Sequence, residues 1–496
     1  MTVTADEGPQ RPPLEWPRVL PPIGCMVLLL TLCSNGYGFE RDELYFRMLH
    51  PAWGYVDQPP LTPLLSHLAA TLSDDAWVLR VPATVFAAGS VSVAVLITRE
   101  FGGGRCAQTL CAWAYAFASF PLLMGHVLLT ATPDLVFSPL IALFVIMVVR
   151  RRRPRWWLAA GTVAGLAGYN KLLIAMVVVA LVLGVLLVGP RRALFNRWFV
   201  VGMVAALVLV LPNLAYQATH DWPQFTMGRA LSAHNGSEVR ITMWPFLLLL
   251  LGPPLVPVWV AGLVSLLRRP AWRPMRFVAV AFVIILVETF LAAGQIYYPF
   301  GLLAVVFAVG CVPTAEFLRR SRPWRVAAVT SIAVNAVISA VIGLPLVPVS
   351  VVGRTPIPAI AQTARDQIGW PTYAEQIATA YRSIPDNERA RAVVIASNYG
   401  EAGALVRYGP ALGLPLPYSG QNQLYFDTAP PAGTTTVIMV EAQLATVQGL
   451  FGTCTVVGRL DNRVGVDNEE QGLPIAICRQ PTRPLPELWP DFQHYD

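Results

Sequence analysis

Between residues 20 and 346 the chain is a succession of apolar runs, and these runs decide what it can fold into. A helical run of about 20 apolar residues matches the thickness of a bilayer, and shorter runs are tolerated inside a bundle. Because 55% of the 496 residues are hydrophobic and only 13% are charged, too little polar surface exists to cover a water-soluble globule. We therefore predict a polytopic α-helical membrane protein with about eleven transmembrane helices. The predicted spans are 20–32, 77–98, 106–123, 135–149, 156–168, 172–188, 198–214, 244–267, 277–293, 300–317 and 326–346.

Arginine clusters fall on alternate connections between these runs, at 150–155, 191–192, 268–276 and 319–325. Because short cytoplasmic loops are rich in Lys and Arg, these connections are predicted to be cytoplasmic. The amino terminus is then cytoplasmic as well, with residues 1–17 forming a disordered leader before a retained signal anchor. The intervening loops and the final 150 or so residues are predicted to lie on the outer, extracytoplasmic face. The clusters also supply most of the net charge of +7, so the charge does not imply nucleic-acid binding.

A change of pattern follows the proline-rich link at 345–358. Short strand-like and helix-like segments alternate there, which predicts a soluble α/β domain over residues 350–496, outside the membrane domain of residues 18–349. The predicted strands are 392–396, 435–440, 454–460 and 474–478, and the predicted helices are 373–382, 401–408 and 442–450. The segment 397–401 suits either a polar ligand contact or an ordinary helix cap.

Two of the seven cysteines, Cys454 and Cys478, lie in this extracytoplasmic domain, each at the end of a predicted strand. Since that compartment is oxidising, we predict a disulfide between them, with two free thiols as the alternative.

Carboxylates at the edge of a membrane are costly to desolvate unless a cation or a reaction compensates for them. Asp42 and Glu43 stand side by side in the first outer loop, and Asp134 begins the fourth span after a proline. Acids that converge on one cavity raise one another's pKa and favour proton transfer. We predict these three as catalytic carboxylates, with helix capping as the alternative for Asp134.

The first outer loop, residues 35–75, is too long for a simple connection between two helices. Its mixture of aromatic and charged residues is typical of the headgroup region, so we expect one or two short helices in the membrane plane. Tyr45, Tyr55, Asp57 and Gln58 are its predicted substrate contacts. The alternative is a loop that only plugs the bundle.

Lys171 is the only lysine in the chain, and all the remaining positively charged residues of the Lys and Arg types are arginines. A compact ammonium group suits a phosphate, with a lysine that merely reaches for the interface as the alternative. Tyr297 and Tyr298, in a later outer turn, supply hydroxyls for the same anion or belong to an aromatic belt. Arg229 and Arg240 are further candidate phosphate contacts.

Five short motifs follow one another along the first 350 or so residues. They are Asp42-Glu43 with Tyr45, Gln58-Pro59-Pro60, Thr132-Pro133-Asp134, the stretch from Gly165 to Lys171, and Tyr298-Pro299. Their order and topology resemble those of the polyprenyl-phosphate-dependent glycosyltransferases of the protein O-mannosyltransferase and aminoarabinose transferase family. The resemblance implies a C-type glycosyltransferase fold with a multi-helix membrane domain, interfacial helices in the first outer loop and a soluble outer domain.

The resemblance also implies a reaction. A sugar would move from a polyprenyl-phosphate donor to a cell-envelope acceptor, which is a protein, a glycolipid or a polysaccharide, on the extracytoplasmic face of the cell membrane. Asp42 matches the family's loop acid and Asp134 its second acid, while Lys171 and Tyr298 match positions that resemble the lipid-phosphate contacts. Asp42 would remove the proton of an acceptor hydroxyl as it attacks the anomeric carbon, with inversion.

Two positions depart from the aminoarabinose transferases. Tyr45 stands where they have an arginine, and Gln58-Pro59-Pro60 replaces their Lys-Pro-Pro. A basic contact is missing, which argues against aminoarabinose and lipid A as the substrates. The cysteines lack metal-ligand spacing, and His220 and His234 could bind a metal but have no third ligand. We therefore predict no metal site and no certain cofactor, and leave a divalent cation open.

A membrane transporter or lipid flippase is the main alternative, because acids and a lone lysine within a bundle also suit ion coupling. The charges gather at one membrane face and no inverted repeat is evident, which favours the transferase. A non-catalytic scaffold that binds through its outer domain is a third possibility, and it would tolerate the loss of Asp42 and Asp134.

Overall fold

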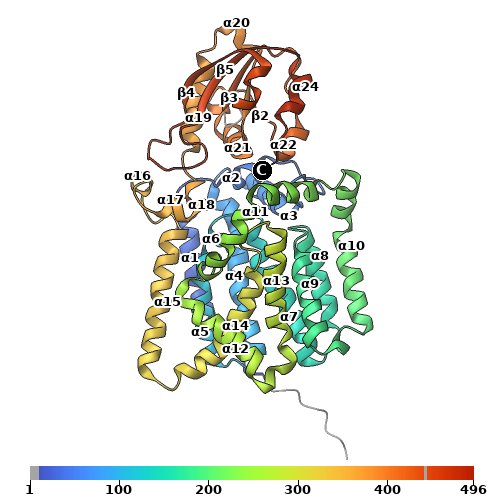
Figure 1. The fold of residues 1–496 in the computed structure, drawn as a ribbon. Helices are drawn as coiled ribbons and strands as arrows, with labels where there is room; N and C mark the ends of the chain where they lie inside the picture. Colours follow the sequence, from blue (N-terminus) through green and yellow to red (C-terminus); the bar gives the residue numbers. More distant parts are fainter. Residues whose placement is uncertain (1–10, 441–443, 496) are drawn as a thin grey trace, which may run out of the picture.

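The computed structural model describes residues 11–440 and 444–495, so residues 1–10 of the predicted leader lie outside the described residues. A helix bundle forms one part of the molecule, and a smaller domain stacks on one end of it (Figure 1). The bundle helices are α1 (Trp16–Cys33), α4 (Ala76–Glu100), α5 (Arg105–Ala116), α6 (Ser119–His126), α7 (Ala131–Arg151), α8 (Trp156–Gly168), α9 (Ile174–Val188), α10 (Arg197–Thr219), α11 (Pro223–Leu249), α12 (Val256–Arg268), α13 (Phe277–Ala292), α14 (Phe300–Leu318) and α15 (Arg322–Gly343).

Six helices in the described part of the chain are long and apolar enough to cross a membrane, namely α1, α4, α7, α10, α14 and α15. Two bent pairs, α5 with α6 and the end of α11 with α12, raise the number to 8 if each pair is one span. The shorter helices α8, α9 and α13 run beside these spans in Figure 1. The chain is therefore a multi-pass membrane protein, and the count of about eleven stays a prediction.

The predicted run 244–267 is interrupted near its middle, between α11 and α12. Gly252 has a φ of 98°, a left-handed conformation that glycine adopts without strain. Pro253 and Pro254 follow, and proline has no N–H with which to continue a helix. The helices on either side consequently meet at 71° instead of forming one straight span.

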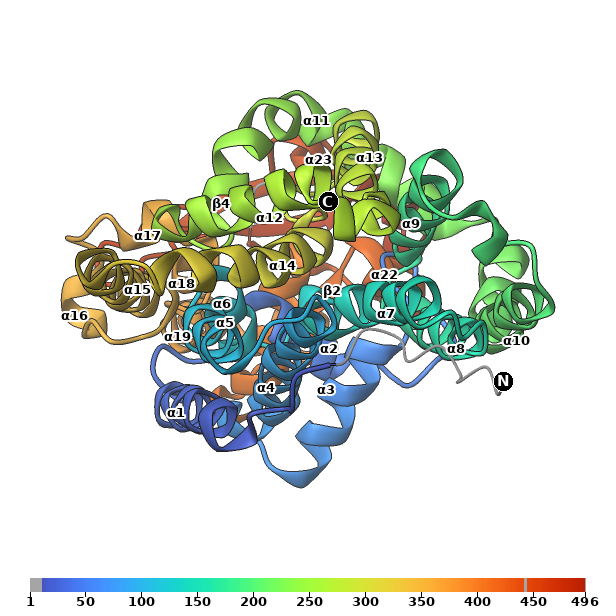
Figure 2. The ribbon, with the colours of Figure 1, turned by 90° about the horizontal axis from the view of Figure 1, so that it is seen from below.

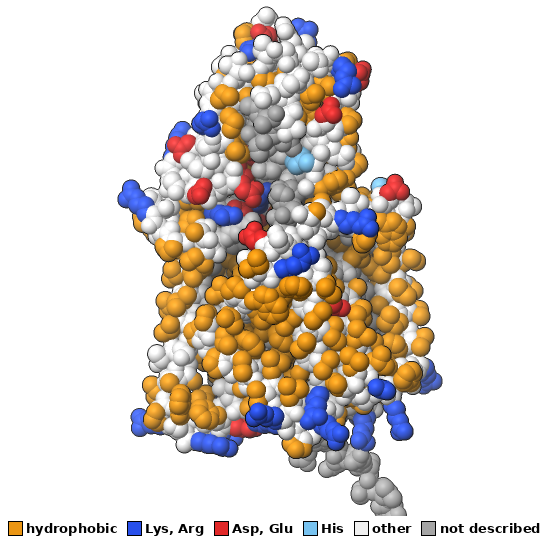
Figure 3. Space-filling view, in the orientation of Figure 1, with side chains coloured by type: hydrophobic (Ala, Val, Ile, Leu, Met, Phe, Trp, Pro, Cys, Tyr) orange, Lys and Arg blue, Asp and Glu red, His pale blue; other side chains and the backbone are white. Residues whose placement is uncertain are grey.

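Burial separates the central helices from the peripheral ones. In the most apolar stretch of α14, 72% of the residues are buried, compared with 17% in α10 and in α15. Seen from below, α10 and α15 lie at opposite edges of the bundle, with α14 and α4 between them (Figure 2). Apolar side chains cover the bundle as a broad band, as expected for a surface that faces lipid (Figure 3).

The first long loop carries two short helices, α2 (Arg41–Met48) and α3 (Leu61–Leu72), which lie between the bundle and the smaller domain (Figure 1). Three further short helices lead from α15 to that domain. They are α16 (Val349–Val352), α17 (Ile357–Ile360) and α18 (Gln362–Arg365).

We call residues 370–495 the C-terminal domain. Its five-stranded sheet has the order β2-β1-β3-β5-β4, in which β1 pairs in parallel with β2 and β3, and β5 is antiparallel to β3 and β4. The strands are β1 (Ala392–Ala396), β2 (Tyr418–Ser419), β3 (Thr436–Val440), β4 (Phe451–Arg459) and β5 (Pro474–Pro481). The helices are α19 (Trp370–Arg382), α20 (Asp386–Arg389), α21 (Tyr399–Tyr408), α22 (Asn422–Asp427), α23 (Leu444–Val447) and α24 (Leu485–Leu488).

The positions of β1, β3, β4 and β5 agree closely with the four predicted strands, and β1 and β3 are buried apolar runs, whereas the two-residue strand β2 was not predicted. The predicted helix 442–450 falls partly outside the described residues, and its described part contains the single-turn helix α23. Cys454 and Cys478 are directly opposite each other in the β4–β5 ladder and are joined by a disulfide.

Candidate active site

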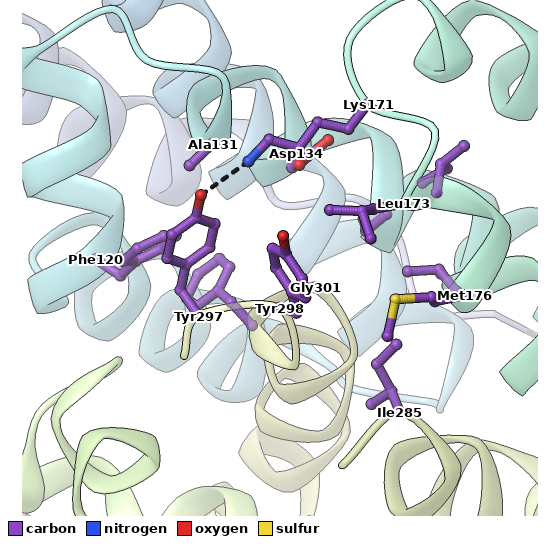
Figure 4. Close-up of a pocket in the computed structure, with 14 residues that line it drawn as sticks. Phe120, Ala131, Asp134, Lys171, Leu173, Met176, Ile285, Tyr297, Tyr298 and Gly301 are labelled. Carbon is purple, nitrogen blue, oxygen red and sulfur yellow. Dashed lines mark hydrogen bonds between the residues drawn. The ribbon is translucent and has the colours of Figure 1, made fainter. Parts of the chain in front are cut away.

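A cavity of about 700 Å³ is lined mainly by the first outer loop, the turn between α8 and α9, α11 and the turn between α13 and α14. We call it the main cavity. Six of the predicted site residues line it, namely Asp57, Gln58, Lys171, Arg229, Tyr297 and Tyr298. A side pocket of about 40 Å³ shares Lys171 and both tyrosines with it and adds Asp134 (Figure 4).

Lys171 stands in the turn that joins α8 to α9, where its side chain reaches toward the turn between α13 and α14. Its ammonium group donates a hydrogen bond of 2.9 Å to the Tyr297 hydroxyl. The same nitrogen lies 4.8 Å from the centre of the Tyr297 ring and 5.9 Å from that of Tyr298. Within the described residues it makes no salt bridge, so its charge is available to an anion in the cavity.

Asp134 lies in the first turn of α7, next to Lys171 (Figure 4). Its carboxylate accepts a hydrogen bond of 3.0 Å from the side-chain amide of Asn170. That amide also donates to the Thr130 carbonyl, and its oxygen accepts from Thr62. Asn170 therefore fixes the acid and, as the neighbouring residue, the start of the lysine side chain.

Asp42 is the second residue of α2. One of its carboxylate oxygens, Oδ1, accepts a hydrogen bond of 2.9 Å from the hydroxyl of Tyr399 in the C-terminal domain. Burial raises the pKa of Asp42, while Arg41, the Tyr399 hydrogen bond and Lys171 oppose that rise. Lys171 acts electrostatically on both Asp42 and Asp134, although only Asp134 lines a pocket together with it.

Glu43 is positioned differently from its neighbour. It is fully buried and forms a salt bridge of 2.8 Å with Arg80, which is 1% exposed. Its two oxygens also accept hydrogen bonds from the backbone N–H groups of Leu128 and Glu40. With both oxygens occupied, Glu43 anchors α2 to α4, and this arrangement argues against the predicted catalytic role.

Replacing Glu43 by alanine should destabilise the protein by about 3–5 kcal/mol, because Arg80 would keep a buried charge without its partner. The thermal unfolding midpoint in detergent measures this effect. Glu316→Ala is the matched control, since it breaks the exposed pair with Arg269 and should cost less than about 1 kcal/mol. Equal midpoint losses in the two variants would contradict the structural role of Glu43.

The other predicted loop contacts divide into two groups. Asp57 and Gln58 line the main cavity. Tyr45 packs its ring 4.8 Å from that of Tyr399 and so contacts the C-terminal domain, whereas the Tyr55 hydroxyl donates to the His50 carbonyl within the loop.

Burial raises the pKa of Asp57 to about 7, well above the value of about 3.9 for an unfolded chain. The folded state therefore holds the proton more tightly, and stability falls as the pH rises from about 4 to about 7. We expect Asp57→Asn to have a higher unfolding midpoint than the unmodified protein at pH 8 and the same midpoint at pH 4. Asp467→Asn, an exposed control, should follow the unmodified protein at both values. A difference for Asp57→Asn that does not depend on pH would disprove this origin.

The two predicted arginines also differ. Arg229 lines the main cavity, and its guanidinium lies 4.3 Å from the centre of the Phe225 ring. Arg240 is not among the cavity-lining residues of the described chain and donates to the Phe290 carbonyl at the end of α13. Its predicted phosphate contact therefore has no support in this geometry.

Two contributors were not among the predicted site residues. Asn170 directly precedes the lone lysine, which is a local signal for a residue that orients it. Tyr399 is 357 positions from Asp42, and the segment 397–401 alone did not separate a ligand contact from a helix cap. In the structure, Asn398 caps α21 while Tyr399 reaches the acid. Across the described residues, no group of three His, Cys, Asp or Glu side chains is placed to hold a metal.

Comparisons with known proteins identify the fold to which this site belongs. A profile of the family described as dolichyl-phosphate-mannose-protein mannosyltransferase matches residues 57–216, which is less than half of the chain. No curated protein matches the sequence. Among solved structures, ArnT from Cupriavidus metallidurans bound to undecaprenyl phosphate is similar, with 16% identity, a TM-score of 0.60, and coverage of 93% of this chain and 98% of that chain.

Two other solved structures are similar. Arabinofuranosyltransferase AftD from Mycobacteria shares 14% identity with a TM-score of 0.51, and the match covers 94% of this chain but only 40% of that chain. The Archaeoglobus fulgidus oligosaccharyltransferase tethered with an acceptor peptide shares 11% identity with a TM-score of 0.50, over 88% of this chain and 70% of that chain. The chain therefore has the fold of these membrane glycosyltransferases, as the motifs of its membrane half predicted.

Proposed function

We propose that this protein is a membrane glycosyltransferase that moves a sugar from a polyprenyl-phosphate donor to a cell-envelope acceptor. One observation carries the proposal. Lys171, the single lysine, lines one pocket together with Asp134, Tyr297 and Tyr298, and its charge also acts on the Asp42 carboxylate. The Lys171 cation can bind the phosphate of the donor, and a carboxylate can act as the base that deprotonates the attacking hydroxyl.

The donor phosphate is the leaving group, and its negative charge grows as the bond to the anomeric carbon breaks. Lys171 would bind this phosphate with help from the hydroxyls of Tyr297 and Tyr298, and Arg229, which also lines the main cavity, would add charge. Preorganised cations act strongly on such a charge where water is largely excluded. The undecaprenyl phosphate bound to the similar ArnT structure supports a polyprenyl phosphate as the partner.

The acceptor hydroxyl must lose its proton as it attacks. Asp42 is the proposed base, with inversion at the anomeric carbon, because its second oxygen, Oδ2, accepts no hydrogen bond within the described residues. Asp134 would hold Lys171 in place and contact the sugar. For Glu43 we propose a positioning role through Arg80, in place of the catalytic role expected from the sequence.

The positions of the charges support an extracytoplasmic reaction. Lys and Arg side chains form a row at the end of the bundle opposite the C-terminal domain (Figure 3). Arginine-rich short loops are typical of the cytoplasmic side, so the cavity and the C-terminal domain would face outward. The acceptor is accordingly a protein, a glycolipid or a polysaccharide of the cell envelope.

A donor assay tests the proposal. Purified protein is incubated with a radiolabelled polyprenyl-phosphate hexose and an envelope extract, and the free lipid phosphate and labelled product are measured. A transferase releases the lipid phosphate in step with the product. A flippase or transporter would move the donor across a vesicle membrane without releasing it, and that result would replace the transferase with the alternative.

A further inference from the structure

The contact between Asp42 and Tyr399 joins two parts of the chain that are far apart in sequence, α2 of the first outer loop and the C-terminal domain. The Tyr399 hydroxyl donates to Asp42 Oδ1 at 2.9 Å. The Tyr399 ring is held on α2 by two neighbours, because the Tyr45 ring lies 4.8 Å away and the Arg41 guanidinium lies 4.7 Å from its centre. The phenol is thus fixed both at its ring and at its hydroxyl.

Several contacts fix the position of the start of α21, which carries Tyr399. Asn398 caps the helix by accepting a hydrogen bond from the Glu401 N–H, and the Tyr399 N–H donates to the Gln421 side chain. Gly403 allows the helix to approach α2 closely, since a Cβ there would lie 2.7 Å from the Leu44 carbonyl. The position of Tyr399 is therefore set by the packing of the C-terminal domain on α2, beyond its own hydrogen bond.

We infer that Tyr399 is a positioning residue for Asp42, so that the C-terminal domain completes the active site instead of only covering it. The inference rests on the proposed function of Asp42 as the base. A hydrogen bond donated to Oδ1 holds the carboxylate in one orientation and leaves Oδ2 for the acceptor hydroxyl. Activity then requires the C-terminal domain to be seated on α2, which links the transfer step to the docking of that domain.

The hydrogen bond has a second consequence, for ionisation. A donor to the charged form of an acid favours that form, and the Tyr399 hydroxyl accordingly lowers the pKa of Asp42. Other groups act on the same carboxylate and stay in place when the hydroxyl is removed. They are Arg41, Lys171, Glu40, Glu43, Asp57 and Tyr297.

Tyr399→Phe removes only the hydroxyl. We expect the acid limb of the pH profile of turnover to move up by about one pH unit or more, because the anion of Asp42 loses a donor. On the acid side of the limb this shift corresponds to a turnover roughly tenfold lower, whereas above the limb the loss should be smaller and the apparent donor KM should change less than about twofold.

The matched control is Tyr373→Phe, which removes a buried hydroxyl of the same domain that donates to Asn468 at 2.8 Å, away from the acid. Its pH profile should match that of the unmodified protein. A Tyr399→Phe variant with an unchanged acid limb would overturn the inference. Thermal unfolding of both variants shows whether the domain stays folded.

A second substitution keeps the test independent of folding. Fluorination of the Tyr399 ring makes its phenol a stronger donor, so the acid limb should move to lower pH, opposite to the effect of phenylalanine. Shifts in the same direction would reject the hydrogen bond as the cause. If the unmodified protein releases no lipid phosphate in the donor assay, the proposed function fails and the inference fails with it, whereas an active protein that is insensitive to Tyr399 overturns the inference alone.

Discussion

Asp42→Asn should lower the rate of sugar transfer by about a hundredfold to ten-thousandfold, the range associated with loss of a general base. Asparagine has nearly the same shape, and its amide oxygen can still accept the Tyr399 hydrogen bond. It cannot take a proton from the acceptor hydroxyl. The variant should therefore bind the lipid donor normally and fail at the chemical step, which single-turnover measurements with prebound donor separate from binding.

Two controls make that result specific to Asp42. Asp467→Asn changes an exposed acid of the C-terminal domain and should leave transfer unchanged. The thermal unfolding midpoint of Asp42→Asn should stay near that of the unmodified protein, since α2 is anchored by Glu43 and its pair with Arg80. Turnover retained in a folded Asp42→Asn variant would remove the proposed base and leave Asp134 as the acid to test.

The features that the sequence predicted well are those that depend on local composition. Long apolar runs identify a membrane bundle because lipid leaves no alternative to internally bonded helices. The lone lysine, Lys171, was informative because the chain otherwise uses arginine throughout. The structure brings Lys171 to Tyr297 and Asp134. The interruption at Gly252 was missed, since hydropathy averages over the two prolines that follow it.

The features that were not predicted depend on long-range pairing. Glu43 and Asp42 are adjacent in sequence, but one is bound by Arg80 of α4 and the other by Tyr399 of the C-terminal domain. Adjacent residues on a helix point in different directions, and nothing local says which of the two faces a cavity. Arg80 itself lies inside an apolar run, where a charge indicates a buried partner without naming it.

Lys171→Ala should have the largest effect on the donor, with turnover lower by about a hundredfold to a thousandfold. The ammonium group is the cation shared by the main cavity and the side pocket, and the Tyr297 hydroxyl that it contacts cannot replace its charge. Affinity for the polyprenyl-phosphate donor should fall, while the preference among acceptors stays the same. Equilibrium binding of the lipid phosphate alone, compared with binding of the uncharged polyprenol, measures the contribution of the phosphate directly.

Two other cations show whether position or charge is responsible. Lys171→Arg keeps the charge but replaces a compact ammonium group with a planar one, so partial activity is expected. Arg229→Gln removes a charge from an exposed side chain of the same cavity and should weaken donor binding less, with an effect that fades as salt is added. If Arg229→Gln impaired binding as strongly as Lys171→Ala, a diffuse positive field would explain recognition. A selective loss at Lys171 instead requires one defined phosphate position, which would hold the sugar where a hydroxyl deprotonated by Asp42 can attack it.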